Sequence, residues 1–225
     1  MPQFQKHSIC VKELFNLKVV FLGLSVFDKV GGIQRYSKDF LIGLSEHRIE
    51  HISISLHDST QVSQNNYFGC NGNKFKFIFL LLKYIKSNDI VVWNHISIGI
   101  IYYFIKPFIS SKKHILLVYG TEVWIRNLSR IKLRALRSFS IIWSISNFTK
   151  NEVVKMHEIN PDNFSFLPCT LKNQILDKSS NPFSKKNLNI LTVSRLDPEP
   201  KINAIYRILD VIPELLTQGF KVHYT

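Results

Sequence analysis

The chain has 225 residues, of which 45% are hydrophobic, including 17 Phe, and 20% are charged. This composition supplies enough apolar surface for a buried core, so it excludes disordered, collagen-like and low-complexity classes. Lys and Arg number 29 against 16 Asp and Glu, which gives a formal net charge of +13. The positive charge predicts an anionic partner: a phosphate-bearing metabolite, an anionic membrane surface or nucleic acid.

The cysteines and the apolar segments indicate a cytoplasmic protein. Cys10, Cys70 and Cys169 are far apart and lack the spacing of a disulfide framework or a zinc site. The first residues, MPQFQKHSICVKELF, lack the continuous apolar region and the small-residue cleavage site of a signal peptide. The longest run without a charged side chain, between Asp89 and Lys106, is too short and too polar for a spanning helix, which needs about 20 mostly apolar residues.

Strands and helices are predicted to alternate along the chain. Apolar runs rich in Ile, Val and Leu predict strands over residues 18–27, 49–56, 89–95, 114–120, 141–146, 189–196 and 221–225. Apolar residues at helical spacing predict helices over residues 33–46, 75–88, 97–108, 131–139, 147–158 and 202–219. Continuous apolar runs are typical of a buried parallel sheet, so we predict an α/β fold: a Rossmann-like parallel sheet with helices on both faces. In the helix over 147–158, Thr149 and Glu152 have capping-box spacing.

A polar segment rich in Ser, Lys and Asn divides the chain. We predict an N-terminal Rossmann-like domain over residues 1–172, a linker over 173–187 and the start of a C-terminal Rossmann-like domain over 188–225. The last part holds a single strand–helix–strand unit, which cannot cover its own faces, so the second domain is predicted to be incomplete. Its apolar surface is expected to promote aggregation when the chain is made alone.

Two adjacent glycines, Gly31 and Gly32, follow the first predicted strand. Such glycines let backbone amides turn toward a ligand, and the following helix presents its positive amino end to an anion. Parallel α/β sheets bind ligands at the carboxyl ends of their strands, where this pair lies. The pair does not form the dinucleotide pattern G-x-G-x-x-G, and the alternative is a turn that merely connects strand to helix.

Arg195 and Lys201 lie at the end of the strand that opens the second predicted domain. Arg offers a planar fork for phosphate oxygens, and Lys offers a point charge. Two cations at this place suit a diphosphate leaving group, because they stabilise the charge that grows as the bond breaks. The alternative is a solvated Arg and Lys on a surface loop.

Polar groups also follow two other predicted strands, at the edge of the sheet where ligands bind. Asn94 and His95 follow one strand, and His95 is able to exchange a proton or to hydrogen-bond a ligand hydroxyl. Tyr119, Glu122 and Trp124 follow the next strand. Glu122 is a candidate to hold a ligand hydroxyl or to cap a helix. The alternatives are a structural histidine at a strand end and a Trp124 that serves in core packing.

Two basic segments have the features of interfacial helices, which combine an apolar face with Lys or Arg flanks. FKFIFLLLKYIK and the Lys74 just before it place Lys74, Lys76, Lys83 and Lys86 around an apolar centre, and RIKLRALR carries four cations. The alternative for both is an ordinary helix packed on the sheet, with its charged ends reaching water.

Several catalytic patterns are absent from the sequence. It contains no Asp-x-Asp pair for a metal and a diphosphate, no P-loop, no G-x-S-x-G elbow and no H-E-x-x-H. These absences argue against an ATPase, a serine hydrolase and a metalloprotease, and we expect no metal cofactor.

Five segments occur in a recognisable order: GGIQRY, DIVVWNH, YGTEVW, WSISNFTKNEV and ILTVSRLDPEPK. Together they resemble GT-B fold glycosyltransferases of the retaining family 4 type, over roughly residues 18–225. The resemblance implies metal-independent transfer of a sugar from a UDP- or GDP-linked donor to a glycan or lipid-linked acceptor. It further implies that the anomeric configuration is retained and that the product belongs to cell-surface polysaccharide or lipopolysaccharide synthesis.

The resemblance also implies which residues bind the donor. The N-terminal domain of such enzymes holds the acceptor, and the C-terminal domain holds most of the nucleotide-sugar. Gly31 and Gly32 would approach the donor diphosphate or sugar, while Arg195 and Lys201 would neutralise the diphosphate.

The candidate catalytic residues are His95, Tyr119 and Glu122, although in this family the leaving phosphate itself takes the acceptor proton. The chain departs from the family pattern where Tyr119 replaces a common His, where Ser194 replaces a usual Gly, and where Lys201 lies one residue later than usual. The family's Glu-x7-Glu stretch does not occur in the sequence, so we expect the 225-residue chain alone to transfer no sugar.

The alternative function is a non-catalytic basic α/β module that binds a membrane or nucleic acid. The charge of +13 favours it, but RRM, KH and zinc-finger patterns are absent, so we expect no nucleic-acid partner. The transferase interpretation predicts a cytoplasmic protein with peripheral contact at the inner face of an anionic membrane, where lipid-linked acceptors reside.

Overall fold

The computed structural model describes residues 17–59, 66–86, 89–109, 113–169, 187–193 and 199–225. The chain forms two compact units, Met1–Lys172 and Asn173–Thr225. Most of the predicted linker, residues 173–186, lies outside the described residues.

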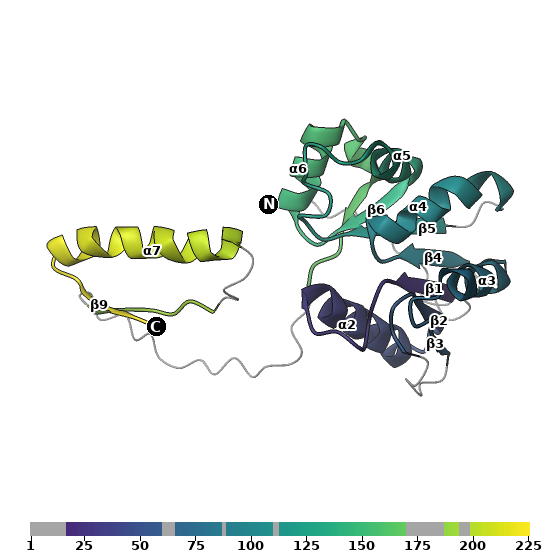
Figure 1. Cartoon of the computed structure of the whole chain (residues 1–225), viewed down its shortest axis with the longest axis horizontal. Helices are drawn as coiled ribbons and strands as arrows, with labels where there is room; N and C mark the ends of the chain where they lie inside the picture. The colour runs from purple at the N-terminus through teal and green to yellow at the C-terminus, as the bar shows by residue number, and fades with distance from the viewer. Residues whose placement is uncertain (1–16, 60–65, 87–88, 110–112, 170–186, 194–198) are drawn as a thin grey trace. The chain divides into compact units, whose positions relative to one another are not determined.

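The first unit is built on a seven-stranded sheet (Figure 1). Its strands are β1 (Lys18–Gly23), β2 (Glu50–Ser55), β3 (Tyr67–Gly69), β4 (Ile90–Trp93), β5 (Lys113–Val118), β6 (Ile141–Ser144) and β7 (Phe164–Phe166). Their order is β3-β2-β1-β4-β5-β6-β7, and every neighbouring pair is parallel. The predicted Rossmann-like α/β fold is therefore confirmed. Strands β3 and β7 were not predicted, because three residues are too few for a periodic pattern.

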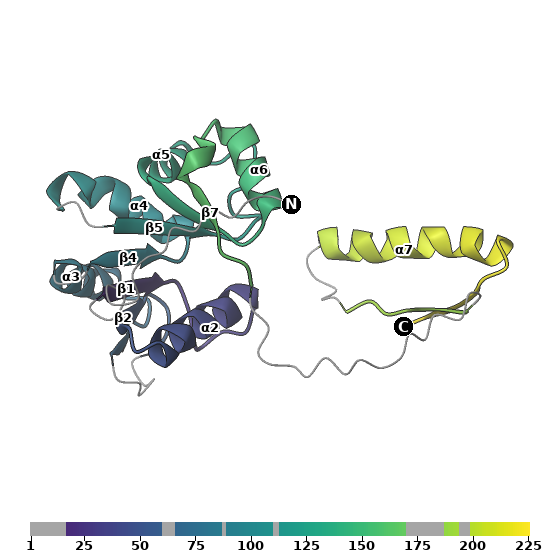
Figure 2. The same cartoon turned by 180° about the vertical axis from the view of Figure 1, so that it is seen from behind.

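Helices cover both faces of this sheet. They are α2 (Gly32–Glu46), α3 (Lys74–Ile85), α4 (Ile96–Ile105), α5 (Arg130–Ser138) and α6 (Asn147–His157), with short 3-10 turns η1 (Lys106–Phe108) and η2 (Pro161–Asn163). Figures 1 and 2 show α2 on one side of the strands and α3 and α4 on the other. In the part of the chain that the structure describes, no helix has the length and apolar character needed to cross a membrane.

The two faces of the sheet form two hydrophobic clusters. In β1, Val20 and Leu22 belong to the cluster under α3 to α6, while Val19 and Phe21 belong to the cluster under α2. All four side chains are buried, because successive residues of a strand point to opposite faces and both faces are covered. This double burial is the reason that the strand sequences read as continuous apolar runs.

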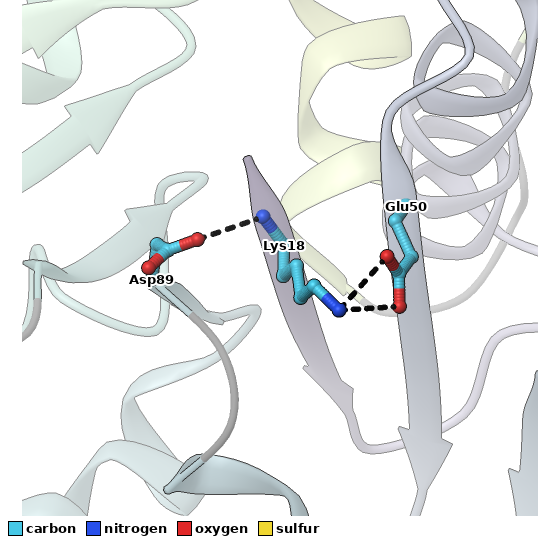
Figure 3. A network of polar contacts seen from close by, with 3 residues as sticks. All are labelled: Lys18, Glu50 and Asp89. Carbon is cyan, nitrogen blue, oxygen red and sulfur yellow. Dashed lines mark hydrogen bonds and ion pairs between the residues drawn. The ribbon is translucent and has the colours of Figure 1, made fainter. Parts of the chain in front are cut away.

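The amino edge of the sheet carries a small polar network (Figure 3). The ammonium of Lys18 lies 3.1 Å from the carboxylate of Glu50, and the backbone N–H of Lys18 donates to Asp89 at 3.1 Å. Both side chains of the ion pair are exposed, so the pair contributes about 0–1 kcal/mol at most. The charged groups at this edge lie at the start of β1, away from the strand ends where ligands bind.

The amino end of α6 differs from the sequence-based prediction. The N-cap is Ser146, whose hydroxyl accepts from the N–H of Thr149 at 3.0 Å. Thr149 is buried inside the helix and donates to the carbonyl of Tyr119 at 3.2 Å. The predicted capping box of Thr149 and Glu152 is therefore wrong, because a serine three residues earlier already satisfies the helix end.

The second unit consists of β8 (Asn187–Ile190), α7 (Glu199–Thr217) and β9 (Lys221–Tyr224). The two strands pair in parallel, as expected for two strands joined by a crossover helix in one sheet. None of its described residues is buried, and Leu191 and Val193 are 71% and 90% exposed. Taken by itself, the unit therefore leaves apolar side chains exposed.

Two glycines inside helices provide a matched test of packing. A Cβ on Gly43 in α2 would meet nothing within 4 Å, whereas a Cβ on Gly99 in α4 would lie 3.3 Å from Phe139 and 3.4 Å from Leu116. We expect Gly43→Ala to raise the free energy of unfolding by about 0.5–1 kcal/mol, through helix propensity alone. Gly99→Ala should lower it by about 1 kcal/mol, because both neighbours are rigid core side chains. Urea denaturation of the two variants measures the difference, and equal shifts would contradict the close packing of α4 on β5.

Candidate functional site

The connections of the sheet reverse direction between β1 and β4. From β1 the chain moves outward to β2 and β3, and then returns to β4 on the other side of β1. In parallel sheets, ligands bind at the carboxyl ends of the strands beside such a reversal. The two loops at this point are the loop from Leu24 to Gly31, after β1, and the pair Asn94 and His95, after β4.

A fully buried carboxylate holds the loop after β1. Asp58, three residues beyond β2, accepts from the hydroxyl of Ser25 at 2.5 Å. It also accepts from the backbone N–H groups of Val26 at 2.7 Å and Phe27 at 2.8 Å. The hydroxyl of Tyr67, at the start of β3, donates to the same carboxylate. The loop is thus tied to β2 and β3 by one side chain.

The loop in turn holds the segment after β2. The carboxylate of Asp28 accepts from the N–H of Ser59 at 2.6 Å. A Cβ on Gly69 would lie 2.7 Å from the carbonyl oxygen of Asp58, so only glycine permits β3 to approach this closely. Because the amides of the loop turn toward Asp58, β1 ends at Gly23, not at residue 27 as the apolar run predicted.

The electrostatics of Asp58 follow from these contacts. Burial acts to raise its pKa, but the hydrogen bonds from Ser25, Tyr67, Phe27 and Val26 outweigh burial and lower the pKa to about 2. Asp58 is therefore ionised at neutral pH. Burial, and after it the hydrogen bond to the same carboxylate, raises the pKa of Tyr67, so that its hydroxyl remains a donor.

The loop after β1 leads directly into α2, whose amino end has no side-chain cap. Gly31 is the N-cap of α2 and offers no side chain to the first amides, which have no acceptor within the helix. The first turn of α2 contains no acidic residue, and a Cβ on Gly32 would meet nothing within 4 Å. Gly31 has extended backbone, so a left-handed conformation is not the reason for a glycine there. Among the described residues no side chain is shown to cap these amides, although the side-chain oxygen of Gln34 lies close to Gly31, so the amino end of α2 presents N–H groups and partial positive charge at the reversal of the sheet.

A buried chain of hydrogen bonds fixes the same helix turn from the other side. Thr149 of α6 donates to the carbonyl of Tyr119, and the hydroxyl of Tyr119 donates to the side chain of Asn94. Asn94 donates to the hydroxyl of Ser37 at 2.7 Å, and Ser37 donates to the carbonyl of Ile33 at 2.7 Å. The chain connects α6, β5 and β4 to the first turn of α2.

Tyr119 serves this network. Its ring lies edge-on to Tyr36, with centroids 5.4 Å apart, and burial raises the pKa of its hydroxyl well above the usual value. The hydroxyl is occupied by Asn94, so the structure gives Tyr119 a positioning role at the predicted site.

His95 is the N-cap of α4, and its Nδ1 accepts from the N–H of Ser97 at 3.0 Å. Burial and the charge of Lys132 lower the pKa of His95, against the opposing effect of Glu122. The imidazole is therefore neutral at pH 7, with its proton on Nε2, since Nδ1 is the acceptor. His95 can donate a hydrogen bond from Nε2 to a ligand, whereas Nδ1 is occupied.

Glu122 is occupied by its own loop. Its carboxylate accepts from the N–H groups of Tyr119 at 2.5 Å and Gly120 at 2.9 Å. Trp124 packs against this loop. A Cβ on Gly120 would lie 3.1 Å from the ring of Trp124, and the ring of Phe148 lies edge-on to that ring with the centroids 5.2 Å apart. Trp124 thus packs within the first unit.

The predicted donor-binding cations lie in the second unit. Arg195 is outside the described residues, and Lys201 belongs to the first turn of α7. Among the residues that the structure describes, no group of three or more His, Cys, Asp or Glu side chains is arranged to hold a metal ion.

Two hollows lie along α2, and His95 lines neither of them. The larger, of about 500 Å³, is lined by Phe27, Lys38 and Tyr67 among others. The smaller, of about 340 Å³, lies beside Phe40 and Leu167. The grouping of polar residues at the strand ends is thus a more specific indication of the site than concavity is.

Sequence reasoning missed Asp58, Ser25 and Tyr67, which build the loop. A signal existed for Asp58, since it is a carboxylate directly after an apolar strand, where parallel sheets gather polar groups. No local pattern indicates Ser25 or Tyr67 as its partners, because they are 33 and 9 residues away.

Comparison with known proteins supports the fold. The structure is similar to that of a lipopolysaccharide outer core galactosyltransferase, WaaB, in its apo form, with a TM-score of 0.55. The match covers 92% of this chain and 68% of that chain at 11% sequence identity. No family model and no curated protein sequence matches the chain. At this identity the likeness is one of fold, and it supports the GT-B fold that the sequence resemblance implied.

The buried carboxylate gives a prediction about acid stability. The pKa of Asp58 in the folded chain, about 2, lies below the ordinary value of 3.8, so its stabilising effect is present above about pH 4 and is lost as the pH falls toward 2. We expect this loss to reach about 2 kcal/mol of unfolding free energy.

Urea denaturation at several pH values measures this loss. Asp58→Asn should be less stable at neutral pH and should lack this part of the acid dependence. Tyr67→Phe removes one donor and so raises the pKa of Asp58 in the folded chain; the loss should still begin near pH 4 but should be smaller. An unchanged acid profile in Asp58→Asn would contradict the buried ionised carboxylate.

Proposed function

We propose that this chain belongs to a glycosyltransferase that moves a sugar from a UDP- or GDP-linked donor to a glycan or lipid-linked acceptor, with retention. The observation that carries the proposal is the open amino end of α2, which lies at the reversal of the sheet and has space beside Gly32. Helix amino ends of this kind bind phosphate and other anions.

The chemistry suits the departure of a nucleoside diphosphate. Negative charge grows on the diphosphate oxygen as the glycosidic bond breaks, and preorganised donors lower the barrier to that step. The amides of α2 supply such donors. Arg195 and Lys201 of the second unit are proposed to neutralise the donor diphosphate, as the sequence resemblance implies. His95 donates from Nε2 to a sugar hydroxyl, with no need to act as a base. The proposal requires no metal ion.

The fold similarity supports the substrate class. The similar structure is named a lipopolysaccharide outer core galactosyltransferase, and lipopolysaccharide is a glycan carried on a lipid. We propose an acceptor of that general class for this chain, and a cytoplasmic location where nucleotide-sugars are available.

A basic binding module is the second candidate, because the net charge of +13 favours any polyanion. The two candidates differ in ligand and in salt dependence. Non-specific binding to duplex DNA weakens steeply with salt, in proportion to the number of phosphates contacted. A nucleotide-sugar site binds a single diphosphate, so the loss of one protein cation should weaken its affinity for the nucleotide.

The first test measures nucleotide binding by calorimetry. We expect UDP or GDP to bind the chain, and Arg195→Ala to weaken that binding at least about tenfold, because a charge-assisted hydrogen bond is lost. Arg207→Ala, which removes an exposed cation of α7, is the matched control and should leave the affinity unchanged. Binding to duplex DNA without any response to UDP or GDP would favour the binding module.

The second test separates the two roles of His95. His95→Ala should lower the free energy of unfolding by about 1 kcal/mol, since the cap of α4 is lost, whereas His95→Asn should retain the cap. Both variants lack Nε2, so both should weaken binding of the UDP- or GDP-sugar to the same extent. Unchanged nucleotide-sugar affinity in His95→Asn would show that His95 is only a cap.

A further inference from the structure

The outer face of α3 is an exposed apolar stripe. Phe75 is 88% exposed, Ile78 38%, Phe79 67% and Leu82 43%. These four positions follow the spacing i, i+3, i+4 and i+7, so they form one continuous stripe along the helix.

The stripe is not needed for the fold of the unit. The opposite face of α3 supplies the core, through the buried side chains of Phe77, Leu80, Leu81 and Ile85. A surface helix normally carries polar residues on its outer face, whereas α3 is apolar on both faces. Exposed apolar patches of this kind mark a surface that binds a partner or a membrane.

Lysines border the stripe on both sides. At 100° per residue, Lys74 and Lys83 lie on opposite flanks of the stripe, and Lys86 follows the last turn. Lys74 and Lys83 are exposed, whereas Lys76 is half-buried and donates a hydrogen bond of 2.9 Å to the carbonyl of Gly69. The sequence contains no Asp or Glu from residue 59 to residue 88, so nothing in α3 offsets this positive charge.

We propose that α3 docks this unit on an anionic lipid bilayer, lying in the plane of the interface. Phe75, Phe79 and their apolar neighbours enter the boundary between headgroups and acyl chains, while Lys74 and Lys83 contact lipid phosphates. This is the arrangement of interfacial helices, whose affinity depends on buried apolar area and on attraction to anionic lipid. The docking is a property of the first unit and does not depend on sugar transfer.

The chemistry of α3 favours lipid over a protein partner. Lys is depleted in interfaces between proteins, whereas Lys beside aromatic residues is typical of membrane surfaces. With 12 residues, α3 is about 18 Å long, too short to span a bilayer but long enough to lie within its surface.

The other basic helix lacks this stripe. On α5, Ala135 and Leu136 are buried, and Ile131 is 39% exposed. Arg137 donates to the carbonyl of His157 at 3.0 Å. Of the two interpretations left open for this segment, the packed helix is therefore the one that the structure supports, while α3 has the features of the interfacial one.

The docking helix and the candidate site share an edge of the sheet. α3 begins shortly after the carboxyl end of β3, and its N-cap Asn73 accepts from the N–H of Lys76. The amino end of α2 follows the carboxyl end of β1, in the same parallel sheet. If the proposed function holds, a lipid-linked acceptor would thus reach the site from the surface on which α3 lies.

Vesicle co-sedimentation tests the proposal. We expect the chain to bind vesicles of phosphatidylglycerol and phosphatidylethanolamine in equal amounts, and to bind vesicles of phosphatidylcholine alone much more weakly. Phe79→Ser should reduce binding to the anionic vesicles about tenfold, and Lys83→Gln about fivefold. The matched controls, Phe166→Ser on β7 and Lys155→Gln on α6, change exposed residues of the same types and should bind like the unmodified chain.

Thermal melts establish that each variant is folded, which the exposure of these side chains leads us to expect. Equal losses in the α3 variants and in the controls would overturn the proposal, because net charge alone would then explain binding. Failure to bind anionic vesicles would also overturn it, as would a dimer that Phe79→Ser dissociates, since α3 would then be a contact between two copies. Nucleotide affinity of the same variants reports separately on the proposed function.

Discussion

The carboxylate of Asp58 is ionised in a fully buried position, and the described residues compensate it with hydrogen bonds from the loop after β1 and from Tyr67. A buried charge without such partners would be strongly destabilising. The loop must therefore turn inward, which ends β1 at Gly23 and directs the chain toward Gly31. The place where α2 begins, and with it the open helix end of the candidate site, depends on this compensation.

A second set of contacts fixes the other side of the site. The hydrogen bonds from Thr149 through Tyr119 and Asn94 to the first turn of α2 are buried and connect elements far apart in the chain. The polar residues at the strand ends thus divide into two kinds. Tyr119 and Glu122 are occupied within the protein and position the loops, while the amides of α2 and Nε2 of His95 are the donors that we propose bind the ligand. Such preorganised donors suit a reaction in which negative charge develops.

Part of the excess positive charge lies at a defined place on the first unit. In α3 it borders an apolar stripe that the fold of the first unit does not require. The stripe and the amino end of α2 belong to helices that begin at one edge of the sheet and cover its opposite faces. The two features differ in chemistry: one depends on apolar area beside lysines, and the other on backbone amides.

The sequence by itself determined the parallel α/β class, the positions of the main strands and helices, and the edge at which polar groups gather. These follow from local periodicity, because a strand buried on both faces and an amphipathic helix each leave a pattern in neighbouring residues. Only the tertiary structure decided that Asp58 pairs with Ser25 and Tyr67, that Tyr119 is occupied by Asn94, and that the outer stripe of α3 is uncovered. Burial and hydrogen bonding depend on groups that folding brings together from distant parts of the chain, and no local pattern records them.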